Sequence, residues 1–338
     1  MNGSDLFALP VGAANLARLE ECLKESVTGD DPFLNEVAGH LIVAGGKRIR
    51  PALTLTAAEL ARPQISRDSI LGGVCVELVH LASLYHDDVM DEAVRRRSVE
   101  SVNARWGNLV AIVAGDFLLA RSAEIAASLG PEIAGLLAAT LARLCQGQVA
   151  EVRAAFQVSR DEKDYLGAIS NKTASLMSTA CRIGALTAGL ARPQVEDLTA
   201  FGESFGMLFQ IRDDILDVIA SEDELGKPPG QDLAEGVYTL PVQRALGDRT
   251  IGAHLAELLG HPLGPEERER ARHLVASSVG VAEAALVARQ YAEEATAAAV
   301  RLEGGGVTER LANLAEDVAC DLYRAAEGAR ERFEEMAG

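Results

Sequence analysis

The sequence predicts an all-α protein, and three observations support this prediction. Hydrophobic residues make up 48% of the 338 residues but aromatic residues only 4%, so the core must be built mainly from Ala, Leu and Val. Ala and Leu are strong helix formers. Apolar residues recur at helical spacing, and no segment sustains the alternation that is typical of a β-strand. Since no linker of disordered composition divides the chain, we expect one domain over residues 1–338.

The expected elements follow one another between Gly and Pro breaks, which start and end helices. An N-terminal helical extension is expected over 1–30, a motif-bearing core over about 33–245, and shorter C-terminal helices over about 250–336. Core helices are expected at 33–43, 51–60, 69–90, 108–128, 131–157, 161–190 and 194–220, with a short turn or helix at 101–108 and a long loop at 221–238.

Composition excludes several classes of function. The formal net charge of −18 argues against a nucleic-acid partner, which needs a basic surface, and against an anionic membrane surface. Five scattered cysteines without a CxxC motif indicate core residues in a reducing compartment. The sequence has no run of about 18 uncharged apolar residues and no signal-peptide pattern at its start. We therefore expect a cytoplasmic protein without a transmembrane segment.

The most informative stretch holds three aspartates at the spacing DDxxD: Asp87, Asp88 and Asp91. In a helix, aspartates at this spacing share one face. They lie at the C-terminal end of the helix expected at 69–90, where the helix dipole favours cations. Because the like charges repel, the array destabilises the helix unless a cation binds there. Such a local conflict is expected at a functional site.

A second DDxxD motif, Asp213, Asp214 and Asp217, lies near the end of the helix expected at 194–220. Carboxylates are hard ligands suited to Mg²⁺, which takes one or two of them and completes its shell with waters and substrate phosphates. Two motifs could hold several Mg²⁺ ions around one diphosphate and make it a better leaving group. The alternative is a pair of solvated acidic helix ends.

Several basic side chains also cluster at unusual places in this acidic chain. They are Lys47 and Arg50 on a Gly-Gly hinge, Arg96 and Arg97 just after the first motif, Lys172 within an apolar stretch, and Lys227 after the second motif. Arg offers phosphate a planar fork of donors and Lys a point charge, so this placement suggests a second anion site. For Arg95–Arg97, pairing with the neighbouring aspartates is the alternative.

Two further polar residues share the helical register of the aspartates. His80 lies two turns before Asp87 on the same side of the helix, which supports a ligand role as well as a core role. Gln210 lies about one turn before Asp213 and could donate a hydrogen bond to a phosphate.

In combination, these motifs resemble those of the trans-isoprenyl diphosphate synthases, the polyprenyl synthetase family. The matching segments keep the family's order over about residues 45–242: 45–51, His80, 84–97, 115–117, 172–173, 209–217, 226–227 and 232–233. The resemblance implies the isoprenoid synthase fold, with helices around a central cavity, and usually a homodimer. It also implies head-to-tail condensation, in which an allylic diphosphate ionises, the double bond of isopentenyl diphosphate attacks the allylic cation, and a proton is lost.

The resemblance assigns the candidate residues to two substrates. Mg²⁺ ions, about three per active site, would be held on the allylic diphosphate by Asp87, Asp88, Asp91, Asp213, Asp214 and Asp217. The same diphosphate would be contacted by Arg96, Lys172, Thr173, Gln210 and Lys227, and isopentenyl diphosphate would be bound by Lys47, Arg50, His80 and Arg97. The catalytic set would be Asp87, Asp88, Asp91, Lys172, Asp213 and Asp214. The sequence departs from the family pattern at Ser98, where Gly is usual, and at Val237, where Lys is common.

In this family, product length depends on the side chains four and five positions before the first motif. Ser83 and Ala82 stand there, and such small residues leave volume for a growing tail. We therefore expect products longer than farnesyl diphosphate; close helix packing is the alternative reason for small residues. The floor of the tunnel is expected deeper, at Cys75, Leu78 or Val79 or on the facing helix at 117–120.

Three other functions remain open. A geranylgeranyl-type synthase would differ only in product length. A class I terpene cyclase would need a different second metal motif and would not use Lys47 and Arg50. A non-catalytic subunit of a heteromeric synthase would be expected to lack some of the aspartates or cations, which are intact in this chain.

Overall fold

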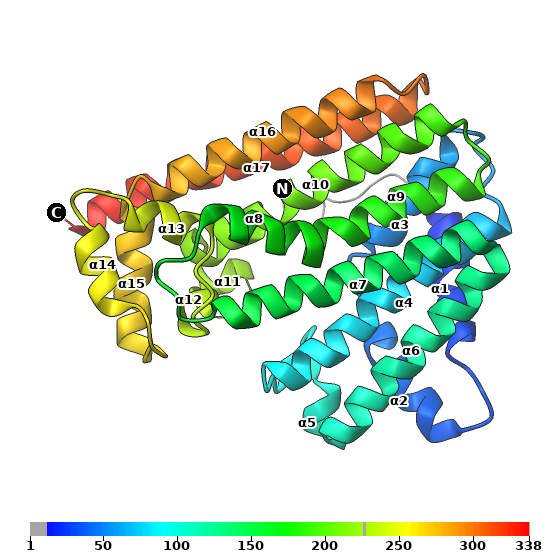
Figure 1. Cartoon of the computed structure of the whole chain (residues 1–338), viewed down its shortest axis with the longest axis horizontal. Coiled ribbons are helices and arrows are strands. Elements are labelled where there is room, and N and C mark those ends of the chain that lie inside the picture. Colours follow the sequence, from blue (N-terminus) through cyan, green and yellow to red (C-terminus); the bar gives the residue numbers. More distant parts are fainter. Residues whose placement is uncertain (1–11, 226–227, 338) are drawn as a thin grey trace. The chain divides into compact units, whose positions relative to one another are not determined.

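The computed structural model describes the backbone of residues 12–225 and 228–337 and, within them, the side chains up to Ala329. In the described chain, helices are joined by loops and turns, and strands occur only in one short hairpin, which confirms the all-α prediction (Figure 1). The helices are α1 (Ala13–Ser26), α2 (Pro32–Val43), α3 (Ile49–Glu59), α4 (Arg67–Met90), α5 (Val102–Trp106), α6 (Asn108–Leu129), α7 (Pro131–Ala154), α8 (Glu162–Ile169), α9 (Ser175–Thr187), α10 (Arg192–Ile219), α11 (Glu222–Leu225), α12 (Gln231–Ala234), α13 (Leu240–Leu246), α14 (Gly252–Leu258), α15 (Pro265–Ser277), α16 (Gly280–Val300) and α17 (Gly306–Ala337). The hairpin pairs β1 (Arg95–Arg96) with β2 (Val99–Glu100) in antiparallel.

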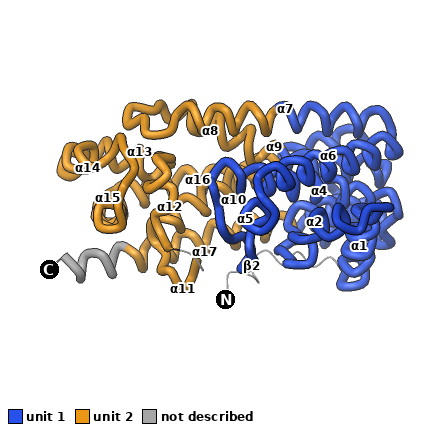
Figure 2. The backbone as a smooth tube through the Cα atoms, turned by 90° about the horizontal axis from the view of Figure 1, so that it is seen from below, with its two compact units in different colours: residues 1–142, 176–202, 299–310 blue, residues 143–175, 203–298, 311–338 orange. Residues whose placement is uncertain are grey.

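The chain divides into two compact units (Figure 2). Unit 1 comprises residues 1–142, 176–202 and 299–310, and unit 2 comprises residues 143–175, 203–298 and 311–338. The boundaries fall inside helices, so α7 and α10 each contribute residues to both units. The expectation of a single domain stays a prediction.

Helix α4 is the central helix of unit 1. Ser66 caps its N-terminus, because the Ser66 side chain accepts a hydrogen bond from the Ser69 amide at 3.1 Å. The apolar positions that predicted this helix are fully buried: Val74, Leu78, Leu81 and Tyr85. Helices α6, α3 and α1 pack against α4. The first aspartate motif forms the C-terminal end of this helix, so the core of unit 1 positions it.

Three parts of the fold differ from the sequence prediction. The long loop expected at 221–238 contains the short helices α11 and α12. The helix expected at 161–190 consists of α8, a π-helix over Ser170–Ala174, and α9. A π turn contains one extra residue, which hydrophobic periodicity does not reveal. In the C-terminal part, α16 and α17 are long because residues 281–300 and 307–327 contain no Gly or Pro.

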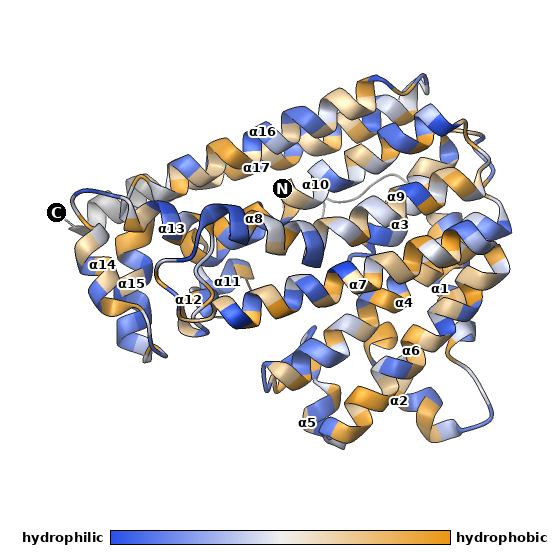
Figure 3. Cartoon of the chain, viewed as in Figure 1, coloured by the Kyte–Doolittle hydropathy of each residue, from blue (hydrophilic) through white to orange (hydrophobic). Residues whose placement is uncertain are grey.

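Two helices, α4 and α7, are long and apolar enough to cross a membrane, judged by length and composition, with mean hydropathies of 1.3 and 1.2. The bent pair α15 and α16 passes the same test when taken as one span. The protein buries 72% of the apolar window of α4 but only 22% of that of α7. Burial in unit 1 therefore accounts for the apolar character of α4. Helix α7 also carries hydrophobic stretches (Figure 3), but most of its apolar window is not buried.

Candidate functional site

The first aspartate motif ends α4 in unit 1, and its three carboxylates have different environments. Asp88 is fully buried. Arg96 Nε donates to its Oδ1 at 2.7 Å, and Arg96 Nη2 forms an ion pair with the same oxygen at 2.6 Å. Asp87 is half-buried and Asp91 is exposed. The motif therefore combines one carboxylate that is fixed inside the protein with two that are more accessible.

The surroundings of Asp88 fix the segment that follows the motif. Burial raises the pKa of the Asp88 carboxyl, and the pairing with Arg96 opposes this shift without cancelling it. The Asn103 amide donates to the Asp88 carbonyl at 3.0 Å. Arg96 thus pairs with a neighbouring aspartate, as the alternative interpretation expects, while about a third of its side chain stays exposed.

Arg97 and Ser98 form the turn of the hairpin in the left-handed backbone region, with φ of +51° and +65°. Residues with a Cβ rarely adopt this region, whereas Gly does so readily. The Ser98 departure from the family pattern therefore falls where the backbone favours Gly.

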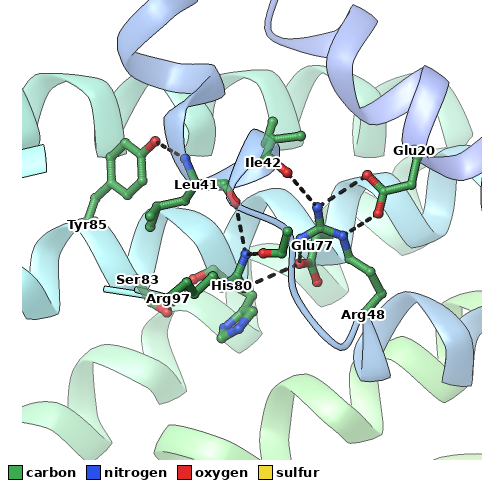
Figure 4. Close-up of polar contacts among 10 residues, drawn as sticks. Glu20, Leu41, Ile42, Arg48, Glu77, His80, Ser83, Tyr85 and Arg97 are labelled. Atoms are coloured by element: carbon green, nitrogen blue, oxygen red, sulfur yellow. Dashed lines mark hydrogen bonds and ion pairs between the residues drawn. The ribbon is translucent and has the colours of Figure 1, made fainter. Parts of the chain in front are cut away.

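The hinge between α2 and α3 lies against Arg97 (Figure 4). Gly45 has a φ of +85°, and a Cβ on Gly46 would lie 2.8 Å from the central guanidinium carbon of Arg97. Arg97 Nη1 donates to the carbonyls of Leu41, at 3.0 Å, and Gly45. The Gly-Gly pair is thus required twice, once for its backbone angle and once for the space that Arg97 fills.

His80 lies close to several of these cations. Burial lowers the pKa of His80 well below its usual value, and the positive charges of Arg50 and Arg97 lower it further. The imidazole is therefore neutral at physiological pH, with one ring nitrogen as donor and the other as acceptor. Of the two cations on the hinge, Lys47 is exposed and Arg50 is half-buried.

In unit 2, Lys172 lies on the π-helix Ser170–Ala174, a type of distortion that is frequent at functional sites. Two glycines leave space for the backbone of this π-helix. A Cβ on Gly147 would lie 2.6 Å from the Lys172 amide nitrogen, and a Cβ on Gly206 would lie 2.5 Å from the π-helix backbone. The Lys172 ammonium pairs with Glu151 at 2.5 Å.

A chain of hydrogen bonds in unit 2 connects three residues that the sequence predicted separately. Thr173 Oγ1 donates to Gln210 Oε1 at 2.7 Å, and Gln210 Nε2 donates to Asp214 Oδ1 at 2.8 Å. The Tyr165 hydroxyl donates to the other oxygen of Asp214. Burial raises the pKa of Asp214 to about 7, although the hydrogen bonds from Tyr165 and Gln210 lower it.

The other two aspartates of the second motif differ in exposure. Asp213 is exposed. Asp217 is buried, and its Oδ2 accepts a hydrogen bond from the Asp232 amide at 3.2 Å. Gly230 donates to the Asp217 carbonyl at 2.7 Å, which holds the following loop against the motif. Lys227, which the sequence predicts to contact the allylic diphosphate, lies outside the described residues.

The two residues expected to govern product length are not equally accessible. Ala82 is fully buried, whereas Ser83 is half-buried and donates to the His80 carbonyl at 2.8 Å. Deeper along α4, Cys75 is buried with its Sγ 3.1 Å from Ser122 Oγ on α6. Leu78 and Val79, the other floor candidates on α4, are buried as well.

The donor set suits Mg²⁺. Asp87, Asp91 and Asp213 carry the more accessible carboxylates, and hard oxygen ligands of this kind are what the ion prefers. Among the described side chains, those of residues 12–225 and 228–329, no three His, Cys, Asp or Glu form a ready-made metal site. Mg²⁺ that takes one or two protein carboxylates and completes its shell with substrate phosphates requires none.

Sequence reasoning missed four side chains at these sites. Tyr165 and Glu151 contact predicted residues of unit 2, and Glu77 contacts Arg48, to which no role was assigned, in unit 1. Glu77 left a signal, because it is the one charged residue in the apolar stretch 70–79. Tyr165 left no signal in the sequence, because a Tyr within an expected helix is most simply interpreted as a core residue.

Comparison with known proteins gives a consistent picture. The sequence model of the family described as Polyprenyl synthetase matches residues 31–277. The chain is 41% identical over 295 residues to the nonaprenyl diphosphate synthase of Mycobacterium tuberculosis, covering 87% of this chain and 88% of that protein. It is 42% identical over 253 residues to heptaprenyl diphosphate synthase component 2 of Geobacillus stearothermophilus, covering 75% and 77%. Among solved structures, a polyprenyl synthase from Caulobacter crescentus CB15, complexed with calcium and isoprenyl diphosphate, matches with a TM-score of 0.87 at 30% identity, covering 94% of this chain and 98% of that chain.

Proposed function

Because this chain belongs to the polyprenyl synthetase family, we propose that it condenses isopentenyl diphosphate head-to-tail with an allylic prenyl diphosphate. The products are all-trans polyprenyl diphosphates longer than farnesyl diphosphate. One observation carries this proposal: each DDxxD motif combines a buried aspartate, held by its neighbours, with an accessible aspartate. The buried residue fixes the geometry, and the accessible one presents a carboxylate that a cation can reach.

The allylic diphosphate is bound by the two motifs and the basic residues beside them. The carboxylates of the two motifs would hold about three Mg²⁺ ions, which would supply positive charge against the diphosphate and so make it a better leaving group. Arg96 and Lys172 donate charge-assisted hydrogen bonds to the same group. Thr173 and Gln210 also contact it, and their bond to each other prepares that arrangement. Lys227 completes the set.

Isopentenyl diphosphate is bound by the cations around the hinge. Lys47, Arg50 and Arg97 supply positive charge, and His80 supplies a neutral hydrogen-bond donor. The double bond then attacks the allylic cation, and the departing diphosphate accepts the proton that is lost. No protein nucleophile is needed for this sequence of steps.

The enzyme acts as a homodimer, and the exposed face of α7 supports this proposal. Val149 and Val152 on α7 are 55% and 61% exposed, and only 22% of the apolar window of this helix is buried. A second copy of the chain would remove this surface from water, which is favourable. Light scattering after size exclusion tests this directly, and a monomer at micromolar concentration would contradict it.

Product length follows from the volume beneath the first motif. Ser83→Phe places a large side chain at a half-buried position, so we expect it to shorten the products. Ala82→Phe tests the same idea at a fully buried position. Chromatographic sizing measures the product lengths of both variants. An identical product ladder for wild type and both folded variants would mean that the tunnel does not pass these residues.

The decisive experiment is incubation of the purified chain with isopentenyl diphosphate, allylic primers of several lengths and Mg²⁺, followed by product sizing. A ladder that continues beyond C20 supports the proposal, whereas a single C20 product supports the geranylgeranyl-type alternative. A second candidate arises because one relative carries the name "component 2" of a heptaprenyl synthase. A chain that consumes no isopentenyl diphosphate alone, but does so with a second protein, would favour that role.

A further inference from the structure

A buried group of charges around Arg48 lies in the hinge region of unit 1 (Figure 4). Arg48 is 7% exposed and Glu77 is 1% exposed. Arg48 Nη1 donates to Glu77 Oε1 at 2.8 Å. Its Nε and Nη2 donate to the two carboxylate oxygens of Glu20, at 2.6 and 3.3 Å, and Nη2 also donates to the Ile42 carbonyl at 3.1 Å. Arg48 is thus held from three sides by α1, α2 and α4.

This arrangement fixes the backbone of the hinge. Arg48 is the N-cap residue of α3 and has a left-handed backbone, with φ of 50° and ψ of 35°. A residue with a Cβ keeps such a conformation only where its surroundings enforce it. The bonds to Glu20 and Glu77 supply that enforcement. Lys47 precedes Arg48 directly and Arg50 follows two residues later, so the conformation of Arg48 sets the directions in which both leave the hinge.

Glu77 also reaches the other cations of this region. Its Oε1 lies 3.9 Å from Arg97 Nη2. His80 follows Glu77 by three residues on α4, which places the two on one face of the helix. Burial raises the pKa of Glu77, but the charges of Arg48, Arg50 and Arg97 oppose this shift. Two arginines, Arg48 and Arg97, thus form ion pairs with one buried carboxylate, which offsets their mutual repulsion before any anion binds.

We propose that Glu77 and Glu20 are positioning residues of the isopentenyl diphosphate site, and that α1 is therefore part of this site. The inference rests on the proposed function, because it deepens the role of the hinge cations. Glu77 holds Arg48 and Arg97 from below, and Glu20 closes the other side of Arg48. Leu19, fully buried next to Glu20, anchors α1 to unit 1. The N-terminal extension thereby takes part in substrate binding without touching substrate.

The test uses three isosteric variants of the full chain: Glu77→Gln, Glu20→Gln and, as a matched control, Glu21→Gln. Glu21 is the exposed neighbour of Glu20 on α1, so the control removes the same charge without removing a bond to Arg48. The KM values for isopentenyl diphosphate and for the allylic primer are measured separately for each variant. Far-UV circular dichroism and a melting curve report whether each variant is folded.

We expect Glu77→Gln to raise the KM for isopentenyl diphosphate by roughly tenfold and Glu20→Gln by about threefold, because each loses part of a buried charge pair. The KM for the allylic primer should stay within about twofold in both, and Glu21→Gln should match wild type. A general structural defect would raise the KM values for both substrates to a similar extent. If Glu77→Gln does not fold, Glu20→Gln carries the test, since Glu20 is 34% exposed and tolerates the change better.

The outcomes separate this inference from the proposed function. A wild-type chain that consumes no isopentenyl diphosphate under any condition contradicts the proposed function. An active wild type whose folded Glu20→Gln and Glu77→Gln variants keep both KM values, or raise them equally, overturns the inference alone. A selective rise for isopentenyl diphosphate supports it.

Discussion

The two aspartate motifs have the same spacing but hold their buried aspartate by different means. Asp88 in unit 1 is paired with a cation, the guanidinium of Arg96. Asp214 in unit 2 is surrounded by neutral donors, the Tyr165 hydroxyl and the Gln210 amide. The two buried carboxylates therefore differ in how strongly the protein stabilises their charge, although both have a raised pKa. Identical spacing thus does not imply identical electrostatics.

The third aspartates differ as well. Asp91 follows the last residue of α4 as its C-cap and is exposed. Asp217 lies inside α10, which continues to Ile219, and is buried. The first motif therefore presents two accessible carboxylates and the second only Asp213. We interpret the first motif as the larger contributor to cation binding.

The largest effect is expected from removing an accessible carboxylate. Asp87→Ala and Asp213→Ala should each lower turnover at least roughly a hundredfold, because each removes charge that stabilises the leaving diphosphate. Initial rates at saturating substrate and Mg²⁺ measure this. Circular dichroism should show unchanged helicity. If both variants turned over normally, the assignment of the two motifs to cation binding would be wrong.

The contrast between the buried aspartates can be tested through their partners. Arg96→Met leaves the Asp88 charge buried without its cation and should lower the free energy of unfolding by about 3 kcal/mol. Tyr165→Phe removes one neutral donor from Asp214 and should lower it by roughly 1 to 2 kcal/mol. Urea titration in Mg²⁺-free buffer measures both values. Equal losses would show that the charge of the partner does not matter.

The raised pKa of Asp214, to about 7, predicts a dependence of stability on pH. Between the ordinary value of an aspartate and about 7, the folded protein binds more protons than the unfolded chain. Its stability in Mg²⁺-free buffer should therefore fall as the pH rises from 5 to 7 and then level off. Asp214→Asn should flatten this curve in a melting experiment, since it removes the titrating group. A slope that persists unchanged in this variant would assign the effect to another group.

The smallest effects concern the left-handed residues that follow each motif. Ser98 in the hairpin and Gly230 in the loop have φ of +65° and +71°. Ser98→Gly should stabilise the protein by up to about 1 kcal/mol, and Gly230→Ala should destabilise it by about the same amount. Melting temperatures measure both. Shifts of the same sign would contradict the backbone explanation of the Ser98 departure.

Most helices could be predicted from the sequence because apolar periodicity and the Gly and Pro breaks are local signals. Val74, Leu78, Leu81 and Tyr85 predicted α4, and all four are buried. The π-helix at Ser170–Ala174 was not predictable in this way, because it depends on space left by two glycines that are distant in sequence, Gly147 and Gly206.

The site was predictable to the extent that its residues are charged and unusual in their surroundings. Asp87 and Asp213 stand out in the sequence because repeated acids at helix ends are unfavourable. The difference in exposure between Asp87 and Asp88 could not be predicted from the sequence, because it depends on which aspartate Arg96 contacts in the folded chain. Tyr165 also escaped notice, since its hydroxyl partner lies 49 residues away along the chain.

The π-helix has a consequence for how this chain tolerates change. The wide turn takes up one extra residue, so the helix after it keeps the phase of the helix before it. Deleting one residue of Ser170–Ala174 would therefore restore an ordinary turn and leave the side chains of α9 on the same faces. Such a deletion should disturb the placement of Lys172 within the segment and leave the packing of α9 in place.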